Sequence, residues 1–283
     1  MNKFFPFFTF LFLLSSCSIF DSSDDVPMYV QVNSASLSTT PNQGSNSNKI
    51  NDVSVYTDGF TIGLYPLGRH IPVLDENNDG MSTVNIFPVI RKNGQNDNPI
   101  QYPFYNSHEF IYPFEEDKLI PLDLEFQYVE NASFIINEDF EGSHIIKQSI
   151  DGIPETEFKK SGEAEYGLFC GKMTTTEDHP FFEEATSFRY KREDLANSPI
   201  FMELDYKNDI PFRVGVVKYS GLAGSREYKI ILTESGEWNK IYLELTSELG
   251  GNDYDEFQIL FGAPGSGVVG NVWIDNIKIL VLK

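Results

Sequence analysis

The stretch that decides the fold is residues 53–65, which read Val53-Ser54-Val55-Tyr56-Thr57-Asp58-Gly59-Phe60-Thr61-Ile62-Gly63-Leu64-Tyr65. Apolar and polar residues alternate on both sides of Asp58-Gly59, and such alternation is typical of half-buried β-strands. An Asp-Gly pair accepts the positive φ angles that a two-residue hairpin turn requires. The segment therefore predicts an antiparallel β-hairpin.

The same kind of pattern continues along the chain in both directions. Short alternating segments separated by turn residues fill residues 27–131, and the pattern restarts around residues 131–137, where we place the domain boundary, and runs to the end. No segment of ten or more residues shows clear helical periodicity, which favours an all-β protein. We expect two β-sandwich domains, at residues 27–131 and 135–283.

The first of these domains resembles a known class of surface module. Residues 55–67, followed by Val84-Asn85-Ile86-Phe87-Pro88, are similar to the PEGA-type and related immunoglobulin-like modules of bacterial surface proteins. The shared pattern is a strand, an Asp-Gly turn, a second strand and a later strand of alternating apolar residues. The resemblance implies an immunoglobulin-like sandwich without catalytic residues.

The second domain resembles the jelly rolls of carbohydrate-binding modules and galactose-binding-like domains. Four short motifs carry the likeness, at residues 137–142, 203–206, 236–242 and 273–277. The resemblance implies a jelly roll and, by analogy of fold, a carbohydrate ligand. It also implies a structural Ca²⁺ ion held by Glu141 and Asp275, which would need carbonyl or water oxygens to complete six to eight ligands. In the alternative interpretation, Glu141 is surface charge and Asp275 caps a strand or turn.

Aromatic residues near the expected loops are the candidates for stacking on a sugar. The two tryptophans, Trp238 and Trp273, lie in segments that such a fold generally uses for packing, so we expect them to be buried. The candidates for a ligand platform are Tyr219, Tyr254, Phe181 and Phe182.

The N-terminal residues predict export and lipidation. Lys3 precedes an apolar run of about eleven residues, the length of a signal-peptide core and too short for a bilayer-spanning helix. Leu14-Ser15-Ser16-Cys17 resembles the bacterial lipobox, which implies cleavage after residue 16 and acylation of Cys17. Two or three acyl chains would anchor the protein stably in a membrane. An ordinary secretory signal with an incidental cysteine is the alternative.

An acidic, serine-rich tether at residues 17–26 follows the signal peptide. It is similar to the export signals of Bacteroidetes-type lipoproteins, which implies an outer-membrane protein, lipid-anchored and exposed on the cell surface. The alternative is a solvated linker with no role in sorting, which leaves open an outer-membrane lipoprotein that faces the periplasm. With Cys17 lipidated, Cys170 is the only remaining cysteine, so no intramolecular disulfide is expected. Cys170 lies in an apolar stretch and is expected to be a buried, inert thiol.

The charge and the missing motifs exclude several functions. The net charge of −21, from 42 acidic and 21 basic residues, argues against nucleic acid as a partner. The four histidines show no metal-binding spacing, and neither a nucleophile elbow nor a phosphate-binding loop is present. We therefore expect a non-catalytic protein that binds carbohydrate. The alternatives are a structural or protein-binding subunit of an envelope, secretion or adhesion assembly and, behind both, a glycoside-active enzyme.

Overall fold

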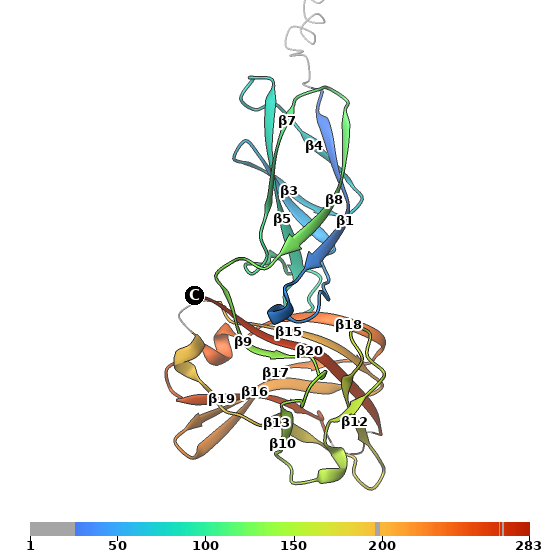
Figure 1. The fold of residues 1–283 in the computed structure, drawn as a ribbon, viewed down its shortest axis with the longest axis vertical. Helices are drawn as coiled ribbons and strands as arrows, with labels where there is room; N and C mark the ends of the chain where they lie inside the picture. The colour runs from blue at the N-terminus through green and yellow to red at the C-terminus, as the bar shows by residue number, and fades with distance from the viewer. Residues whose placement is uncertain (1–25, 196–198, 266, 268) are drawn as a thin grey trace, which may run out of the picture.

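The computed structural model describes residues 26–195, 199–265, 267 and 269–283. It is nearly all β and consists of two sandwiches stacked end to end (Figure 1). The chain passes from the first sandwich to the second between residues 128 and 131. The signal peptide, Cys17 and nearly all of the tether lie outside the described residues.

The first domain packs a three-stranded sheet against a five-stranded one. Asp58 and Gly59 have φ angles of 50° and 87°, which confirms the predicted hairpin turn. The smaller sheet has the order β4-β1-β8, with β1 and β8 parallel. Its strands are β1 (Met28–Ser38), β4 (His70–Val73) and β8 (Leu119–Gln127). The larger sheet contains β2 (Asp52–Thr57), β3 (Phe60–Pro66), β5 (Met81–Arg91), β6 (Pro99–Gln101) and β7 (His108–Pro113).

The second domain is a jelly-roll sandwich of two six-stranded sheets. The sheet that contacts the first domain, here called the near sheet, contains β9 (Ala132–Glu138), β11 (Lys159–Ser161), β12 (Cys170–Thr175), β15 (Phe201–Asn208), β18 (Ser235–Glu244) and β20 (Gly270–Leu282). The other, here called the far sheet, contains β10 (Ile146–Ser149), β13 (Glu183–Thr186), β14 (Tyr190–Lys191), β16 (Phe212–Ser220), β17 (Ala223–Leu232) and β19 (Glu256–Gly262). The helical elements are short: η1 (Pro41–Gln43), η2 (Pro154–Thr156), η3 (Arg192–Leu195) and α1 (Thr246–Leu249).

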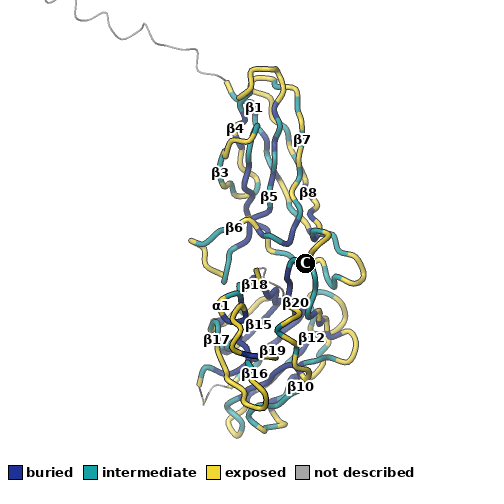
Figure 2. Tube along the Cα trace, turned by 90° about the vertical axis from the view of Figure 1, so that its left-hand side faces the viewer, coloured by how far each residue is buried: buried dark blue, intermediate teal, exposed yellow. Residues whose placement is uncertain are grey.

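Strand periodicity places the core of the second domain between its two sheets. Val214 and Val216 of β16 face Met202 and Leu204 of β15 within one buried cluster. Figure 2 shows the buried residues running along the strands of both domains, whereas the loops at the two ends of the molecule are exposed. The sheets are therefore stabilised mainly by apolar burial, as the alternating sequence predicts.

The two domains share one hydrophobic cluster. Phe201, Tyr242 and Leu280 lie on the outer face of the near sheet and belong to the core cluster of the first domain. The rings of Tyr102 and Tyr242 are 4.9 Å apart in a T-shaped contact across the boundary. Because the core is continuous, we expect the domains to move as one body.

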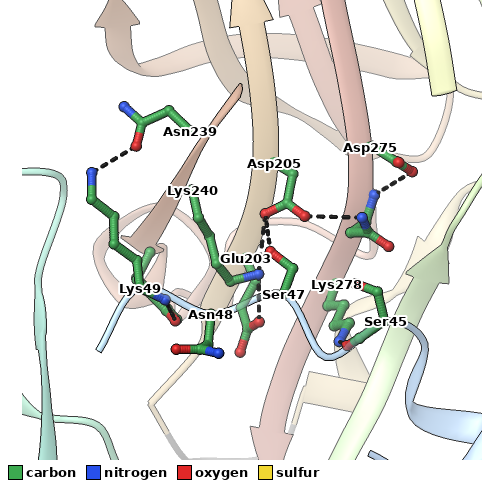
Figure 3. A network of polar contacts seen from close by, with 12 residues as sticks. Ser45, Ser47, Asn48, Lys49, Glu203, Asp205, Asn239, Lys240, Asp275 and Lys278 are labelled. Atoms are coloured by element: carbon green, nitrogen blue, oxygen red, sulfur yellow. Dashed lines mark hydrogen bonds and ion pairs between the residues drawn. The ribbon is translucent and has the colours of Figure 1, made fainter. Parts of the chain in front are cut away.

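A buried charge cluster reinforces this junction (Figure 3). Glu203 is fully buried, pairs with Lys240 at 3.1 Å, and accepts hydrogen bonds from the hydroxyls of Tyr102 and Tyr128 of the first domain at 2.9 and 3.0 Å. Burial alone would raise the pKa of Glu203, but the ammonium groups of Lys240 and Lys278 outweigh it and hold that pKa below its usual range. The carboxylate is therefore charged and contacts side chains of both domains.

A loop of the first domain completes the contact. The Ser47 hydroxyl donates to Oδ1 of Asp205 at 2.8 Å, and Lys278 donates to the carbonyl of Ser45 at 2.9 Å. Residues 45–49 thus lie across the outer face of the near sheet (Figure 3). A large part of this face is therefore covered by the first domain.

Candidate ligand-binding face

The outer face of the far sheet lies on the side of the second domain away from the first (Figure 1). On β16, Val214 and Val216 point into the core, so Arg213, Val217 and Tyr219 point outward. The neighbours of β16 are β17 and β19, which bring further polar and aromatic side chains to the same face.

Tyr228 of β17 lies across the sheet because Gly262 leaves room for the hydroxyl end of its ring. It is opposite Gly215 on β16, and a Cβ atom added to Gly262 on β19 would lie 2.4 Å from its hydroxyl oxygen. That hydroxyl donates to Oε1 of Glu183 on β13 at 2.6 Å. Burial and the neighbouring Glu183 carboxylate raise the pKa of Tyr228 well above its ordinary value. The half-buried ring is thus a neutral, flat surface fixed over the centre of the sheet.

Tyr219 is held in a similar way at the end of β16. A Cβ atom on Gly224 would lie 2.7 Å from its ring, and its hydroxyl donates to Gln258 of β19. The amide of Gln258 in turn donates to Oε1 of Gln148 on β10 at 2.7 Å. A chain of hydrogen bonds therefore links three strands of the face.

Three arginines lie beside these rings. The guanidinium carbon of Arg189 is 3.6 Å from the centre of the Tyr219 ring, and that of Arg213 is 5.0 Å from the Tyr228 ring. Arg226 pairs with Oε2 of Glu183 at 3.2 Å. We call this surface the arginine–tyrosine face. Its members are Glu183, Arg189, Arg213, Tyr219, Arg226, Tyr228 and Gln258.

A charged cavity of about 570 Å³ adjoins the Tyr219 end of the face. Its lining residues are Lys191, Arg192, Glu193, Gly221, Tyr254, Asp255 and Glu256. Arg189 connects it to the face, because its guanidinium lies 3.5 Å from Oε2 of Glu256. The face and this cavity together offer flat rings, amides, carboxylates and guanidinium groups.

The four residues predicted as a ligand platform do not come together. Tyr219 lies on the arginine–tyrosine face, but its ring is covered by Arg189 and only 6% exposed. Tyr254 is buried, donates its hydroxyl to the carbonyl of Leu249 and lines the adjoining cavity. Phe182 is fully buried in the core, and Phe181 packs against it. The predicted exposed platform is therefore wrong for these rings, since three of them contribute to packing inside the domain.

The two tryptophans lie outside the core between the sheets. Trp273 is buried, as expected, but on the outer face of the near sheet, where the ammonium of Lys172 lies 4.7 Å from its ring centre. Trp238 is half-buried and donates its indole N–H to the carbonyl of Glu163 at 3.1 Å. The expected burial is therefore confirmed for Trp273, although outside the core between the sheets, and is wrong for Trp238.

The residues predicted to hold calcium fit a cation in part. Asp275 is buried, and its Oδ2 has no hydrogen-bond partner in the described structure. Burial, with the charges of Asp205, Asp139 and Glu141 adding to it, raises the pKa of Asp275 to about 8.

Glu141, however, is engaged elsewhere. Its Oε1 accepts the backbone N–H groups of Leu168 and Phe169 at 2.6 and 2.9 Å. Among the residues that the structure describes, no group of three or more His, Cys, Asp or Glu could hold a metal ion. Calcium at Glu141 and Asp275 therefore stays a prediction.

Sequence reasoning missed Tyr228, Gln258 and the arginines. A usable signal was the alternation of 212–219, which places Arg213 and Tyr219 on one face. The crossing of Tyr228 over Gly262 depends on strand order, for which the sequence carries no local signal.

Cys170 is buried as predicted, and burial raises the pKa of its thiol to about 12. Within the described ranges, no helix is long and apolar enough to cross a membrane.

Solved structures of carbohydrate-binding modules resemble about half of the chain. A family 30 carbohydrate-binding module has a TM-score of 0.43 at 16% identity, covering 54% of this chain and 88% of that one. The CBM22-1 xylan-binding domain from Paenibacillus barcinonensis Xyn10C gives 0.39 at 12%, over 55% and 98%. The family 11 carbohydrate-binding module of cellulosomal cellulase Lic26A-Cel5E of Clostridium thermocellum gives 0.39 at 16%, over 52% and 92%. No protein-family model and no curated protein matches the sequence.

Proposed function

We propose that this protein binds carbohydrate, without catalysis, through its arginine–tyrosine face. The observation that carries the proposal is the fixed Tyr228 ring, which reaches from β17 across the far sheet to Glu183 and is bordered by Glu183, Arg213 and Arg226. A flat ring with a few oriented polar groups is the arrangement that fixes a sugar by its apolar face and its hydroxyls.

The burial of the other sheet supports this choice of surface. A two-sheet sandwich has two outer faces, and a large part of the near one is covered by Tyr102, Tyr105 and Tyr128 of the first domain. The far sheet keeps half-buried and exposed polar side chains around Tyr228. A ligand that meets a broad sheet face would therefore use the far sheet.

The expected lipid anchor is compatible with a ligand-binding surface on the far sheet. β1 begins at the end of the first domain that lies farthest from the second domain (Figure 1). An acylated Cys17 would attach to the membrane from that end, so that the arginine–tyrosine face points away from the bilayer. We therefore propose a lipoprotein that presents its ligand-binding face to the medium or to neighbouring envelope polysaccharide.

The test of carbohydrate binding uses residues 26–283 as a soluble protein on a glycan array, followed by calorimetry on the best ligand. Tyr228→Ala should weaken binding at least tenfold, since stacking is lost. Tyr166→Ala is the matched control, because Tyr166 is also half-buried but lines a cavity at the domain junction. Loss of binding in Tyr166→Ala alone would move the site to the junction, and no glycan binding by the unaltered protein would overturn the proposal.

The lipid anchor is tested separately on the full chain. Palmitate labelling and membrane fractionation of the unaltered chain should give a labelled membrane protein. Cys17→Ser should abolish the label and release the protein from the membrane. A labelled Cys17→Ser protein would contradict lipidation at this residue.

A further inference from the structure

We infer, on the basis of the proposed carbohydrate binding, that the ligand is an acidic glycan whose carboxylate groups are bound by Arg213 of the arginine–tyrosine face. The chain contains only six arginines, and 42 acidic residues are available to pair with them. Three of the six, Arg189, Arg213 and Arg226, nevertheless gather on this one sheet face. Arg189 and Arg226 are paired with Glu256 and Glu183, which leaves Arg213 as the guanidinium of this face that can take a negatively charged ligand group.

Arg213 is the central member of this set. Its guanidinium forms no ion pair with any carboxylate among the residues that the structure describes, and its one side-chain hydrogen bond there goes to the carbonyl of Pro264. A guanidinium has five N–H donors, so most of its donors remain for a ligand. In a chain so rich in carboxylates, an arginine without a carboxylate partner is positioned to receive one from outside.

The stacking geometry supports the same conclusion. Arg189 lies over the Tyr219 ring, but its N–H groups already meet Glu256 and the carbonyl of Gly221. Arg213 lies over the Tyr228 ring, and apart from the bond from Nη2 to Pro264 the N–H edge of its guanidinium has no partner among the described residues. That edge matches a carboxylate in a bidentate pair, which adds orientation as well as energy. A uronic-acid residue stacked beside Tyr228 would offer its carboxylate to Arg213 in this way.

The overall charge of −21 does not prevent such binding. Repulsion between the protein and an acidic polymer acts over long range, and at about 0.1 M salt it is screened beyond roughly 10 Å. Direct pairs between a carboxylate and Arg213 act at contact distance and are screened much less. Local positive groups can therefore select the ligand on a surface that is negative elsewhere.

The experiment compares polysaccharides that differ only in charge. Polygalacturonate and alginate are each tested by calorimetry with their carboxylate groups ionised, here called the acid form. They are tested again after the carboxyl groups have been reduced to hydroxymethyl groups, which turns the uronic acid residues into neutral sugars. At least one acid form should bind at least tenfold more tightly than its reduced form. Equal or tighter binding of the reduced forms, or binding of neutral glycans alone, would overturn this inference and leave carbohydrate binding standing. Failure to bind any glycan would overturn both.

Variants then assign the effect to Arg213. Arg213→Gln should reduce the preference for the acid form to less than threefold, and Arg213→Lys, which keeps the charge without the planar fork, should retain part of it. Arg69→Gln makes the same charge change on an exposed residue of the first domain and should leave the preference unchanged. An equal effect of Arg69→Gln would show that only net charge matters and would contradict the assignment. Since the comparison of ligands uses the unaltered protein, it remains decisive even where a variant fails to fold.

Discussion

Glu203→Gln is expected to destabilise the whole molecule, because Glu203 joins the two domains. The carboxylate is fully buried, pairs with Lys240 at 3.1 Å and accepts hydroxyl groups of Tyr102 and Tyr128. Glutamine keeps the shape but removes the charge, which leaves Lys240 and Lys278 less well compensated. Removing one partner of a buried ion pair costs about 3–5 kcal/mol. Since Lys240 also lies 3.3 Å from Asp205, we expect the lower end, about 3 kcal/mol.

Urea unfolding followed by circular dichroism and by tryptophan fluorescence measures this loss. Circular dichroism reports on both domains, whereas Trp238 and Trp273 report on the second, so a shared core predicts coincident transitions. Glu244→Gln is the matched control. Its pair with Lys92 also crosses the junction, but both side chains are about 30% exposed, so we expect a loss below about 1 kcal/mol. The reasoning is refuted if Glu203→Gln costs no more than Glu244→Gln, or if the two probes give separate transitions in the unaltered protein.

Three further changes test other parts of the structure. Gly262→Ala should force the Tyr228 ring off Glu183 and weaken glycan binding several-fold, while calorimetric stability changes by less than about 1 kcal/mol, because alanine also restricts the unfolded chain. Burial raises the pKa of Asp275 to about 8, so its protonated form contributes stability at low pH that is lost as the pH rises towards 8. Asp275→Asn should flatten this decline in melting scans from pH 5 to 8, and added calcium should raise the melting temperature of the unaltered protein but not of the variant if a cation binds there. Phe182→Ala should lower the free energy of unfolding by about 3–5 kcal/mol, since the ring is fully buried; loss of binding at unchanged stability would contradict its place in the core.

Local patterns in the sequence were sufficient to predict the class of fold. The Asp58-Gly59 hairpin and the alternation in 212–219 follow from turn chemistry and the two-residue period of a strand. Both signals depend only on neighbours in the chain. They can therefore be recognised in the sequence without knowledge of the tertiary structure.

The candidate site could be predicted only in part. Alternation in 212–219 is enough to place Tyr219 and Arg213 on the same side of one strand, although Arg213 was not among the predicted residues, and it does not show which side faces the core. Tyr228 and Gly262 come together because β16 lies between β17 and β19, an order that depends on the whole jelly roll. Phe182 was mistaken for a loop residue because it precedes the short strand β13, although its ring fills the core. Contacts between distant segments were thus the missing information.

The continuous junction between the domains would also allow several copies of the protein to bind one polymer together. β1 has 11 residues, so the first domain holds the second at a stand-off of roughly 35 Å, and the shared core leads us to expect no hinge between them. If Cys17 is acylated, neighbouring copies in one membrane would present their arginine–tyrosine faces at the same height. A long polymer lying parallel to the bilayer could then bridge several copies, and each contact would raise the effective concentration for the next. Weak binding by a single copy would in this way become firm retention of the polymer at the membrane surface.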